Sequence, residues 1–456
     1  MRRLLVILTA LATALALAIP AIAASDNNTT REYIVLTNGQ GVSAKQLADI
    51  RAAGGTIERI IPQVGLVTVS GDGDFVAAAS SIRGVRSVSL NATVDWLPGN
   101  ETVVAAEVGN PPNSGSDDFF FDLQWGHAAI DAPAAWANGK RGAGALVAVL
   151  DTGFDLTHPD LVENIDIELS EDFTGEGLQY TLPDTFSHGT HVAGTIAAAE
   201  NEFGIIGVAP DATLMLVKVL SDAGSGTFDD VIAGIVYAAD NEADIINMSL
   251  GARLERNGFF DDNDEFVTAR EVAELLTALD RATTYAYQRG TTVIASAGND
   301  AEDYDGNGPV VHSPSDSPHV ISISATAPIG WATDPDNVFL DNLASYSNFG
   351  RSVIDFAAPG GDFVYPGEDP CTIAGLVRPC WVFDLVFSTG NGGWYWSAGT
   401  SMAAPHAAGV AALIVGANGG DMKPAQVERE LRKTADDLGQ PGNDPFYGMG
   451  RVNANG

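Results

Sequence analysis

The run ALVAVLD at residues 145–151 decides the fold class, because it is a continuous apolar segment that ends in an acidic residue. Similar apolar runs follow it at 213–220, 243–251, 291–299, 319–325 and 352–360. Stretches with helical periodicity separate the earlier runs, at 188–199, 227–240 and 264–289. Apolar strands that alternate with amphipathic helices predict an α/β domain, in which helices cover both faces of a mostly parallel sheet.

A site in such a sheet is expected at the carboxyl ends of the strands. Asp151, Gly251 and Asn299 each stand at the end of one of the apolar runs. These three positions therefore direct the search for functional residues.

Residues 31–96 form a separate small unit. Apolar runs at 31–37, 56–62, 65–71 and 85–91 predict four strands, and 43–55 and 74–84 predict two helices. The order βαββαβ is that of a ferredoxin-like α+β domain. Residues 97–118 are rich in Pro, Gly, Asn, Ser and acidic residues, which is typical of a linker, and a larger domain is expected over 119–456.

The N-terminus has the pattern of a secretory signal peptide over residues 1–23, with two arginines, an apolar run and the small-residue site Ala21-Ile22-Ala23. A membrane anchor is the alternative, but we expect no later segment to span a bilayer. We therefore expect an exported protein. In an oxidising compartment Cys371 and Cys380, the only two cysteines, are expected to form a local disulfide.

The chain has a formal net charge of −36, which argues against a nucleic-acid partner. Such acidity favours solubility and says little about the fold. Acidic loops also offer the oxygen ligands that Ca²⁺ prefers.

Three segments carry candidate chemistry: VAVLDTGFDLTHPDL (147–161), FSHGTHVAGTI (186–196) and GTSMAAPHAAG (399–409). Each has a plain structural interpretation. An Asp at a strand end often caps a turn, a His at a helix start often faces solvent, and Thr400 or Ser401 could cap a helix whose first turn holds Pro405. Taken together, an Asp, a His and a Ser in these settings favour nucleophilic catalysis.

The chain resembles the subtilisin family (subtilases) from residue 122 to about 454. The resemblance rests on DTG at 151–153, HGTHVAG at 188–194, SAGN at 296–299 and GTSMAAPH at 399–406. It implies a subtilisin-like doubly wound sheet and a serine endopeptidase. It also implies a triad of Asp151, His188 and Ser401 in the order Asp, His, Ser, with Asn299 in the oxyanion hole. His191 and His406 are then expected to be structural.

The resemblance also implies a peptide-binding cleft that acts on polypeptide substrates. One wall would be Ser249-Leu250-Gly251, which pairs with substrate main chain, and the other Ser296-Ala297-Gly298, with Asp300 at the rim. Small residues on both walls predict a roomy pocket. His312 falls near the pocket floor in this comparison, and the alternative is that it faces solvent.

A structural Ca²⁺ site is a further implication of the family pattern. Its expected ligands are Asp160, the side chain of Asn201 and the carbonyls of Ala199 and Ile205, with Asp122 as a suggested N-terminal ligand. No organic cofactor is expected.

The 31–96 unit resembles the family's inhibitory propeptide, which would assist folding as an intramolecular chaperone and occupy the cleft until the linker is cut. We therefore expect a monomeric, self-processing precursor. Two insertions, 253–266 and 361–391, are expected at the surface, where either could shape specificity. A secreted esterase with the same triad and a catalytically silent binding protein on this fold are the alternatives.

Overall fold

The computed structural model describes residues 29–456 except 98–101, 106–117, 119, 184 and 307. The signal peptide expected over 1–23 lies outside the described residues, as does most of the linker expected over 97–118.

An eight-stranded sheet forms the centre of the large domain, as the apolar runs predict. Its strand order is β18-β17-β15-β11-β7-β9-β8, with β19 also paired to β17. All these pairs are parallel except β17 with β18. The bounds are β7 (Leu146–Asp151), β8 (Glu171–Asp172), β9 (Thr213–Lys218), β11 (Ile245–Met248), β15 (Thr292–Ser296), β17 (Val320–Ala327), β18 (Asn342–Leu343) and β19 (Phe356–Pro359).

The chain reverses its direction across the sheet at β7. It runs from β7 to β9 on one side and then crosses back to β11 on the other side. Strand ends diverge at such a reversal, and this leaves room for a site. The doubly wound arrangement expected from the sequence is confirmed.

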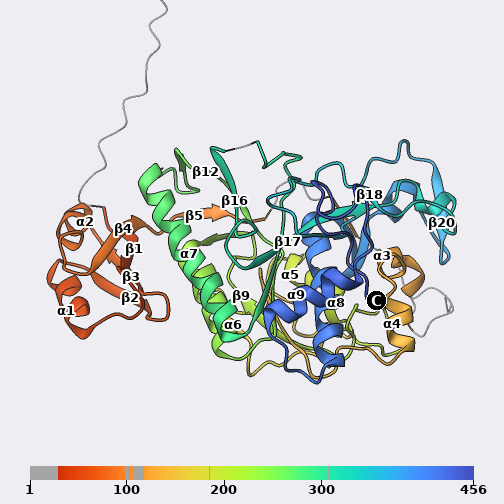
Figure 1. The fold of residues 1–456 in the computed structure, drawn as a ribbon, viewed down its shortest axis with the longest axis horizontal. Coiled ribbons are helices and arrows are strands. Elements are labelled where there is room, and N and C mark those ends of the chain that lie inside the picture. Colours follow the sequence, from red (N-terminus) through yellow and green to blue (C-terminus); the bar gives the residue numbers. More distant parts are fainter. Residues whose placement is uncertain (1–28, 98–101, 106–117, 119, 184, 307) are drawn as a thin grey trace, which may run out of the picture.

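Helices cover both faces of the sheet (Figure 1). Helices α5 (His188–Ala197) and α8 (Thr400–Ala417) pack on one face, and α6 (Phe228–Asp240) and α7 (Ala269–Arg289) pack on the other. Val147 and Val149 of β7 join the core under α5 and α8, whereas Ala148 and Leu150 join the core under α6 and α7. This double burial explains why the β7 segment is apolar without alternation.

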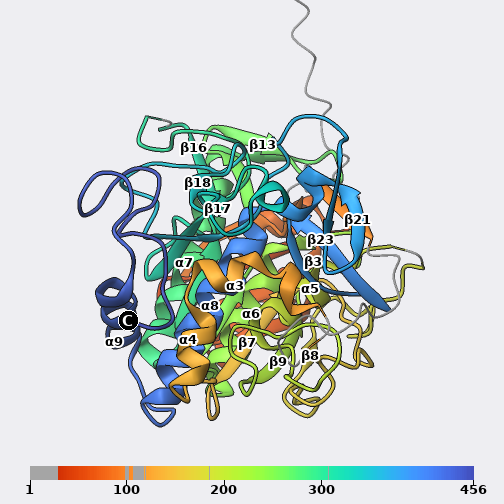
Figure 2. The same ribbon diagram turned by 90° about the vertical axis from the view of Figure 1, so that its right-hand side faces the viewer.

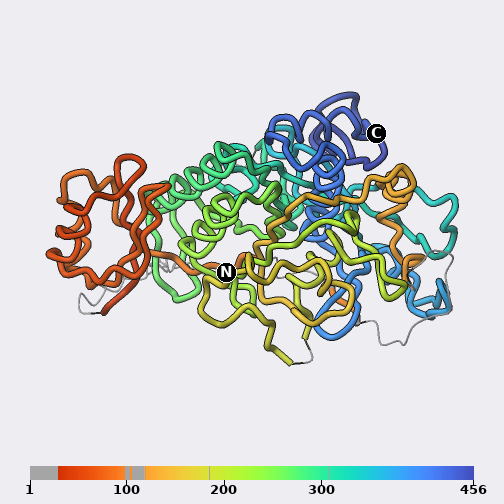
Figure 3. The backbone as a smooth tube through the Cα atoms, turned by 90° about the horizontal axis from the view of Figure 1, so that it is seen from below, coloured from red at the N-terminus to blue at the C-terminus, as the bar shows by residue number. Residues whose placement is uncertain are grey.

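The small N-terminal unit has the order β1 (Arg31–Thr37), α1 (Ala44–Ala52), β2 (Thr56–Ile61), β3 (Leu66–Gly71), α2 (Gly73–Ala79), β4 (Val85–Leu90). Its sheet is antiparallel, with strand order β2-β3-β1-β4. The unit lies at one end of the molecule, beside α6 and α7 (Figures 1 and 3).

The remaining helices and strands lie around the central sheet (Figure 2). The helices are α3 (Trp125–Ala129), α4 (Ala132–Ala137) and α9 (Pro424–Thr434). The paired strands are β5 (Thr93–Asp95) with β10 (Ser225–Thr227), β12 (Ala252–Glu255) with β16 (Val310–Ser313), β13 (Gly258–Phe260) with β14 (Phe266–Thr268), β20 (Pro370–Ile373) with β21 (Leu376–Pro379), and β22 (Val386–Gly390) with β23 (Gly393–Ala398) and β6 (Thr102–Ala105).

Three expectations are corrected by the fold. The helix expected over 264–289 begins at Ala269, because residues 266–268 pair with β13 as a strand. The 361–391 segment is not only a surface decoration, since Val382, Phe383 and Leu385 are buried in the main core. It also contains the expected disulfide between Cys371 and Cys380.

The third correction concerns membrane spans. By its length and composition alone, helix α8 is long and apolar enough to cross a membrane, contrary to expectation. However, 83% of this helix is buried inside the protein, as is typical of a helix in the core of a domain.

Candidate active site

Asp151 and His188 form the centre of the site at the carboxyl end of β7. Asp151 is the last residue of β7, and His188 is the first residue of α5. The Oδ1 of Asp151 lies 2.7 Å from the Nδ1 of His188. Both side chains are buried. The Ser187 hydroxyl caps α5 by accepting the N–H of Thr190, which holds the start of the helix beside the strand end.

Ser401 is the second residue of α8, which begins at Thr400 with Gly399 at the N-cap. The structural alternative, in which Thr400 or Ser401 caps this helix, is wrong, because the N-cap position is occupied by Gly399. Among the described residues, the buried Ser401 Oγ has no hydrogen-bond partner. The serine hydroxyl is therefore available for chemistry.

The sequence suggested that Pro405 lies in the first turn of α8, but it lies in the second turn. Proline has no N–H, so it cannot bond the carbonyl four residues before it, which is that of Ser401. This carbonyl instead accepts the hydroxyl of Ser249, at 2.8 Å. Ser249 in turn accepts the side-chain amide of Asn247 at 2.9 Å, so the end of β11 is tied to the serine.

Asn299 is held by Thr400, which the sequence analysis considered only as a helix cap. The Asn299 Oδ1 accepts both the Thr400 N–H (2.9 Å) and the Thr400 hydroxyl (2.7 Å). Because the amide oxygen faces Thr400, the amide NH₂ is turned to the other side. Thr400 Oγ1 also accepts the N–H of Gly298 at 3.0 Å.

Two other histidines near the site are structural, as expected. His191 is buried, its Nε2 lies 3.2 Å from the Tyr395 carbonyl, and burial lowers its pKa to about 3. His406 Nδ1 lies 2.8 Å from the Met402 carbonyl, and burial lowers its pKa to about 4. Both rings are neutral at pH 7.

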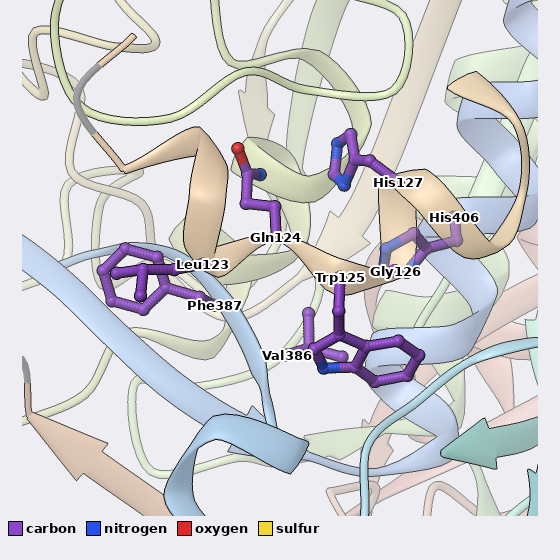
Figure 4. Close-up of a pocket in the computed structure, with 8 residues that line it drawn as sticks. All are labelled: Leu123, Gln124, Trp125, Gly126, His127, Val386, Phe387 and His406. Carbon is purple, nitrogen blue, oxygen red and sulfur yellow. The ribbon is translucent and has the colours of Figure 1, made fainter. Parts of the chain in front are cut away.

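His406 lines a small cavity with His127 and Gln124, on the side of α8 toward α3 (Figure 4). The cavity has a volume of about 10 Å³, which is near the lower limit for one water molecule. It is too small for a substrate side chain.

The end of the N-terminal unit, β5 and Trp96, lies against the walls of the site just before the linker begins. Strand β5 pairs antiparallel with β10, and the N–H of Trp96 donates to the Gly224 carbonyl at 3.2 Å. On the opposite wall, the N–H of Gly251 donates to the Trp96 carbonyl at 2.9 Å. The wall expected at 249–251 therefore contacts an extended chain, but β10 is a second wall that the sequence analysis missed. The small residues Gly224-Ser225-Gly226, three residues after the apolar run 213–220, were the signal for it.

Residues 102–105 of the linker form β6, which lies close to Ser401 in the chain pairing. β6 pairs antiparallel with β23, and Thr102 lies opposite Ala398, three residues before the serine. Trp394-Tyr395-Trp396 thus belong to a strand that contacts the linker, and Trp396 is also a core residue.

The roomy pocket expected between the two walls is wrong, because His312 occupies it. A Cβ placed on Gly251 would lie 2.3 Å from His312 Cε1, and one on Gly298 would lie 2.4 Å from His312 Nε2. The ring therefore touches both walls. It is 4% exposed, which rules out the solvent-facing alternative.

His312 is held in place within the pocket. Its Nδ1 lies 3.1 Å from Ser315 Oγ, and burial lowers its pKa to about 4. Asp300 is exposed at the rim and accepts an N–H from the Asn348 side chain. Ser296 and Ala297 lie on the far wall, where the Ser296 hydroxyl reaches the Leu250 carbonyl at 3.4 Å.

The four expected calcium ligands lie around one loop. Asp160 Oδ2 accepts the N–H of Ile205 (3.0 Å), and the N–H of Ala199 donates to the Asp160 carbonyl (2.7 Å). The Asn201 side chain donates to the Pro159 carbonyl at 3.3 Å. Asp160 Oδ1 is buried without a hydrogen-bond partner among the described residues.

Two neighbours of this loop were not foreseen. Asp118 Oδ1 accepts the N–H groups of Asn201 and Phe203, whereas the suggested ligand Asp122 is exposed. Trp394 Nε1 donates to Asp160 Oδ2 at 2.8 Å. Burial is the main cause that raises the pKa of Asp160 to about 7, and the nearby Asp118 contributes to this rise. Within the described residues, no group of three or more His, Cys, Asp or Glu side chains could hold a metal, so a site here needs main-chain carbonyls.

Comparison with known proteins agrees with this geometry. The family model described as the subtilase family matches residues 142–450. A thermophilic serine proteinase of Bacillus sp. (strain AK1) is 32% identical over 401 residues, which cover 87% of this chain and 82% of that protein. Thermitase of Thermoactinomyces vulgaris is 33% identical over 340 residues, which cover 74% of this chain and 97% of thermitase.

A solved structure shows the same fold. The epidermin leader peptide processing serine protease of Staphylococcus aureus superposes with a TM-score of 0.71 at 22% identity, covering 94% of this chain and 97% of that one. Taken with the two sequence relatives and the family match, the chain belongs to the subtilase family and is a serine peptidase.

Proposed function

We propose that this peptidase is made as an exported precursor that cuts its own linker. The observation that carries the proposal is the path of the linker on both sides of Ser401. Trp96 is held by Gly224 and Gly251 on one side, and Thr102 lies opposite Ala398 on the other. By chain continuity, the bond that is cut lies between Trp96 and Thr102.

The proposed chemistry follows from the residues at this point. Ser401 Oγ attacks the carbonyl of the bond and gives its proton to His188, which later passes it to the leaving amine. Asp151 accepts the other ring N–H, which fixes the tautomer and stabilises the imidazolium. Water then hydrolyses the acyl-enzyme by the same proton transfers.

The developing oxyanion would be bound by the Asn299 NH₂ and the Ser401 N–H. The contacts of Asn299 Oδ1 with Thr400 support this role, because they orient the amide before substrate arrives. The start of α8 adds its positive end to the same field.

The N-terminal unit is proposed to act as propeptide, both as folding template and as inhibitor. One face of its sheet carries Tyr33 and Val35 and is covered by its own helices. The other face carries Ile34 and Leu36 and packs in the core with residues of α6 and α7. Arg59 adds ion pairs with Asp229 (2.6 Å) and Asp230 (2.8 Å) at the start of α6. A unit that buries both faces of its sheet only when docked suits a template for slow parallel-sheet folding.

A structural calcium ion is also proposed at the Asp160 loop. The unpartnered Oδ1 of Asp160 and the nearby carboxylate of Asp118 fit a divalent cation, since burial raises the pKa of Asp160 and a bound cation would favour its ionised form. Asp160, Asp118, Asn201 and the carbonyls of Ala199 and Ile205 would hold it. Its bound charge would stabilise the loop and take no part in the reaction.

Calcium is tested by thermal unfolding of the processed enzyme with calcium or with a chelator. Chelation should lower Tm, because an ion that binds only the folded state adds to its stability. Asp160→Asn should remove most of this response, whereas Asp303→Asn, at a distant exposed loop, should keep it. An unchanged Tm on chelation would refute the site.

Self-processing is tested by intact mass of the purified chain with and without Ser401→Ala. The wild type should lose the residues up to the linker, and the variant should keep them. If both chains keep the linker intact, the self-processing proposal fails. The β-pairing on both sides of the serine favours an extended polypeptide over a simple ester as substrate.

A further inference from the structure

The turn Asp261–Glu265, which joins β13 to β14, contacts β5 on the edge away from β10. We propose that this turn, here called the hairpin tip, is a binding site for the main chain of polypeptide substrates. It would extend the groove outward past Gly251. The inference rests on the function proposed above, since it takes β5 as the stand-in for a substrate.

Three hydrogen bonds join the hairpin tip to Thr93. The Thr93 N–H donates to Asp261 Oδ2 (3.3 Å), and the Asp262 N–H donates to the Thr93 carbonyl (2.9 Å). The Asn263 side-chain amide donates to Thr93 Oγ1 at 3.2 Å. The first two bonds involve main-chain groups of Thr93, so they suit any residue at this position.

The two edges of β5 are bound by different partners. Val94 lies opposite Gly226 of β10, and the Trp96 N–H also points to that side. Thr93 points its N–H and carbonyl to the hairpin tip instead. Successive residues of a strand present their main-chain groups to opposite edges, so the strand is held as if in the middle of a sheet.

Bonds within the turn shape the tip, and Arg31 of β1 also forms an ion pair with Glu265 at 2.7 Å. Asp261 Oδ1 accepts the N–H groups of Asn263 and Glu265, and the Asp261 N–H donates to the Glu265 carbonyl. One carboxylate oxygen therefore shapes the turn, while the other is left to face the strand. Because these bonds lie within the turn, they orient Asp261 independently of the chain that binds.

The ligand class follows from this geometry. The site recognises an extended polypeptide that continues at least three residues N-terminal to the position of Trp96. Short peptides that begin at Trp96 cannot reach it. The enzyme should therefore prefer long extended segments on the acyl side, which is the side that stays attached to Ser401.

The test uses the processed enzyme and fluorogenic peptides with the linker sequence. The long peptide has the sequence of residues 91–104, NATVDWLPGNETVV, and the short one begins at Trp96. A third peptide is the long one with the Thr93 nitrogen methylated, which deletes the N–H that reaches Asp261. The enzymes are the wild type, Asp261→Ala, and Asp264→Asn as the control within the same turn.

We expect methylation to lower the kcat/KM of the wild type about tenfold, as befits a hydrogen bond to a carboxylate. In Asp261→Ala the methylated and parent peptides should differ by less than about twofold, because the acceptor is gone. Asp264→Asn should behave like the wild type. Methylation acts on the substrate, so the result does not depend on how a variant folds.

Equal kcat/KM for the parent and methylated peptides in the wild type would overturn the inference. So would equal kcat/KM for the long and short peptides. In both cases cleavage itself would still support the proposed function. If the wild type cuts none of the peptides, the proposed function fails, and this inference fails with it.

Discussion

The two sides of the cleft hold the precursor's own chain very differently. On the acyl side β5 is bonded along both edges, and Trp96 is fully buried. On the leaving-group side β6 pairs along one edge with β23, and Val103 is 37% exposed. More contacts therefore hold the part of the chain that would remain bound after the proposed cut. We expect the N-terminal product to stay bound and inhibit, and the other strand to leave.

Trp96→Ala should have the largest effect, because it removes a buried side chain that holds the chain on the acyl side. The indole packs on Phe228, with ring centroids 5.0 Å apart, and its Nε1 donates to the Gly226 carbonyl at 3.0 Å. Loss of a buried Trp side chain costs about 3 kcal/mol, which is roughly a hundredfold in an equilibrium constant. The N-terminal fragment carrying this change should inhibit the processed enzyme roughly a hundredfold more weakly.

The control fragment carries Lys45→Ala, since Lys45 is exposed on α1 and lies outside the cleft. Its inhibition constant should match that of the unmodified fragment. Equal inhibition by the Trp96→Ala fragment would mean that the acyl side does not hold the product.

His312→Gly should sharpen the comparison, because it changes only the acyl-side pocket. Removing the imidazole that touches Gly251 and Gly298 opens the space between the walls. The kcat/KM for peptides with Phe or Leu just before the cut should rise about tenfold, relative to peptides with Gly there. Steady-state kinetics on matched peptides measures this ratio. An unchanged ratio would show that His312 does not limit the pocket.

The same ring predicts a pH dependence of stability. Burial lowers the pKa of His312 to about 4 in the folded state, against about 6.5 in an unfolded chain. The unfolded chain therefore takes up the proton first. This group lowers the free energy of unfolding as the pH falls from about 6.5 to 4, by about 1.4 kcal/mol per pH unit.

Denaturant unfolding of Ser401→Ala, with and without His312→Asn, measures this slope. The doubly substituted chain should lose stability less steeply over that window, while His191 and His406 contribute equally to both. Parallel curves would contradict the assignment of His312 as a buried neutral histidine.

Val103→Ala should have the smallest effect, because it trims the exposed leaving-group strand. Little buried area is lost, and the pairing with β23 uses main-chain atoms. The rate of self-processing should change less than about threefold. Intact mass over time measures this rate. A larger decrease in the rate would show that the leaving-group side contributes substantially to binding.

The sequence was sufficient for the framework of the molecule. The apolar strand ending at Asp151 and the helix beginning at His188 predicted the sheet, and local periodicity predicted the order of the N-terminal unit. Such features depend on residues close together in the chain. The pairing of Asp151 with His188 was implied by the resemblance to the subtilisin family and not by the periodicity.

The remaining features depend on contacts between distant segments. The filling of the pocket by His312 arises because β16 pairs with β12 and brings the ring between two glycines. The hairpin tip meets Thr93 across 168 residues of sequence. Asp118 reaches the Asp160 loop from a segment that reads only as linker. Neither hydrophobic periodicity nor residue spacing predicts such contacts between distant segments.

The most direct test of the account is the position of the cut in the wild-type chain. Intact mass and terminal sequencing of the two fragments define the bond. The account predicts one primary cut between Trp96 and Thr102, with the N-terminal fragment still bound to the enzyme. A primary cut outside that interval, with these residues left joined, would contradict the claim that the threaded linker is the first substrate of Ser401.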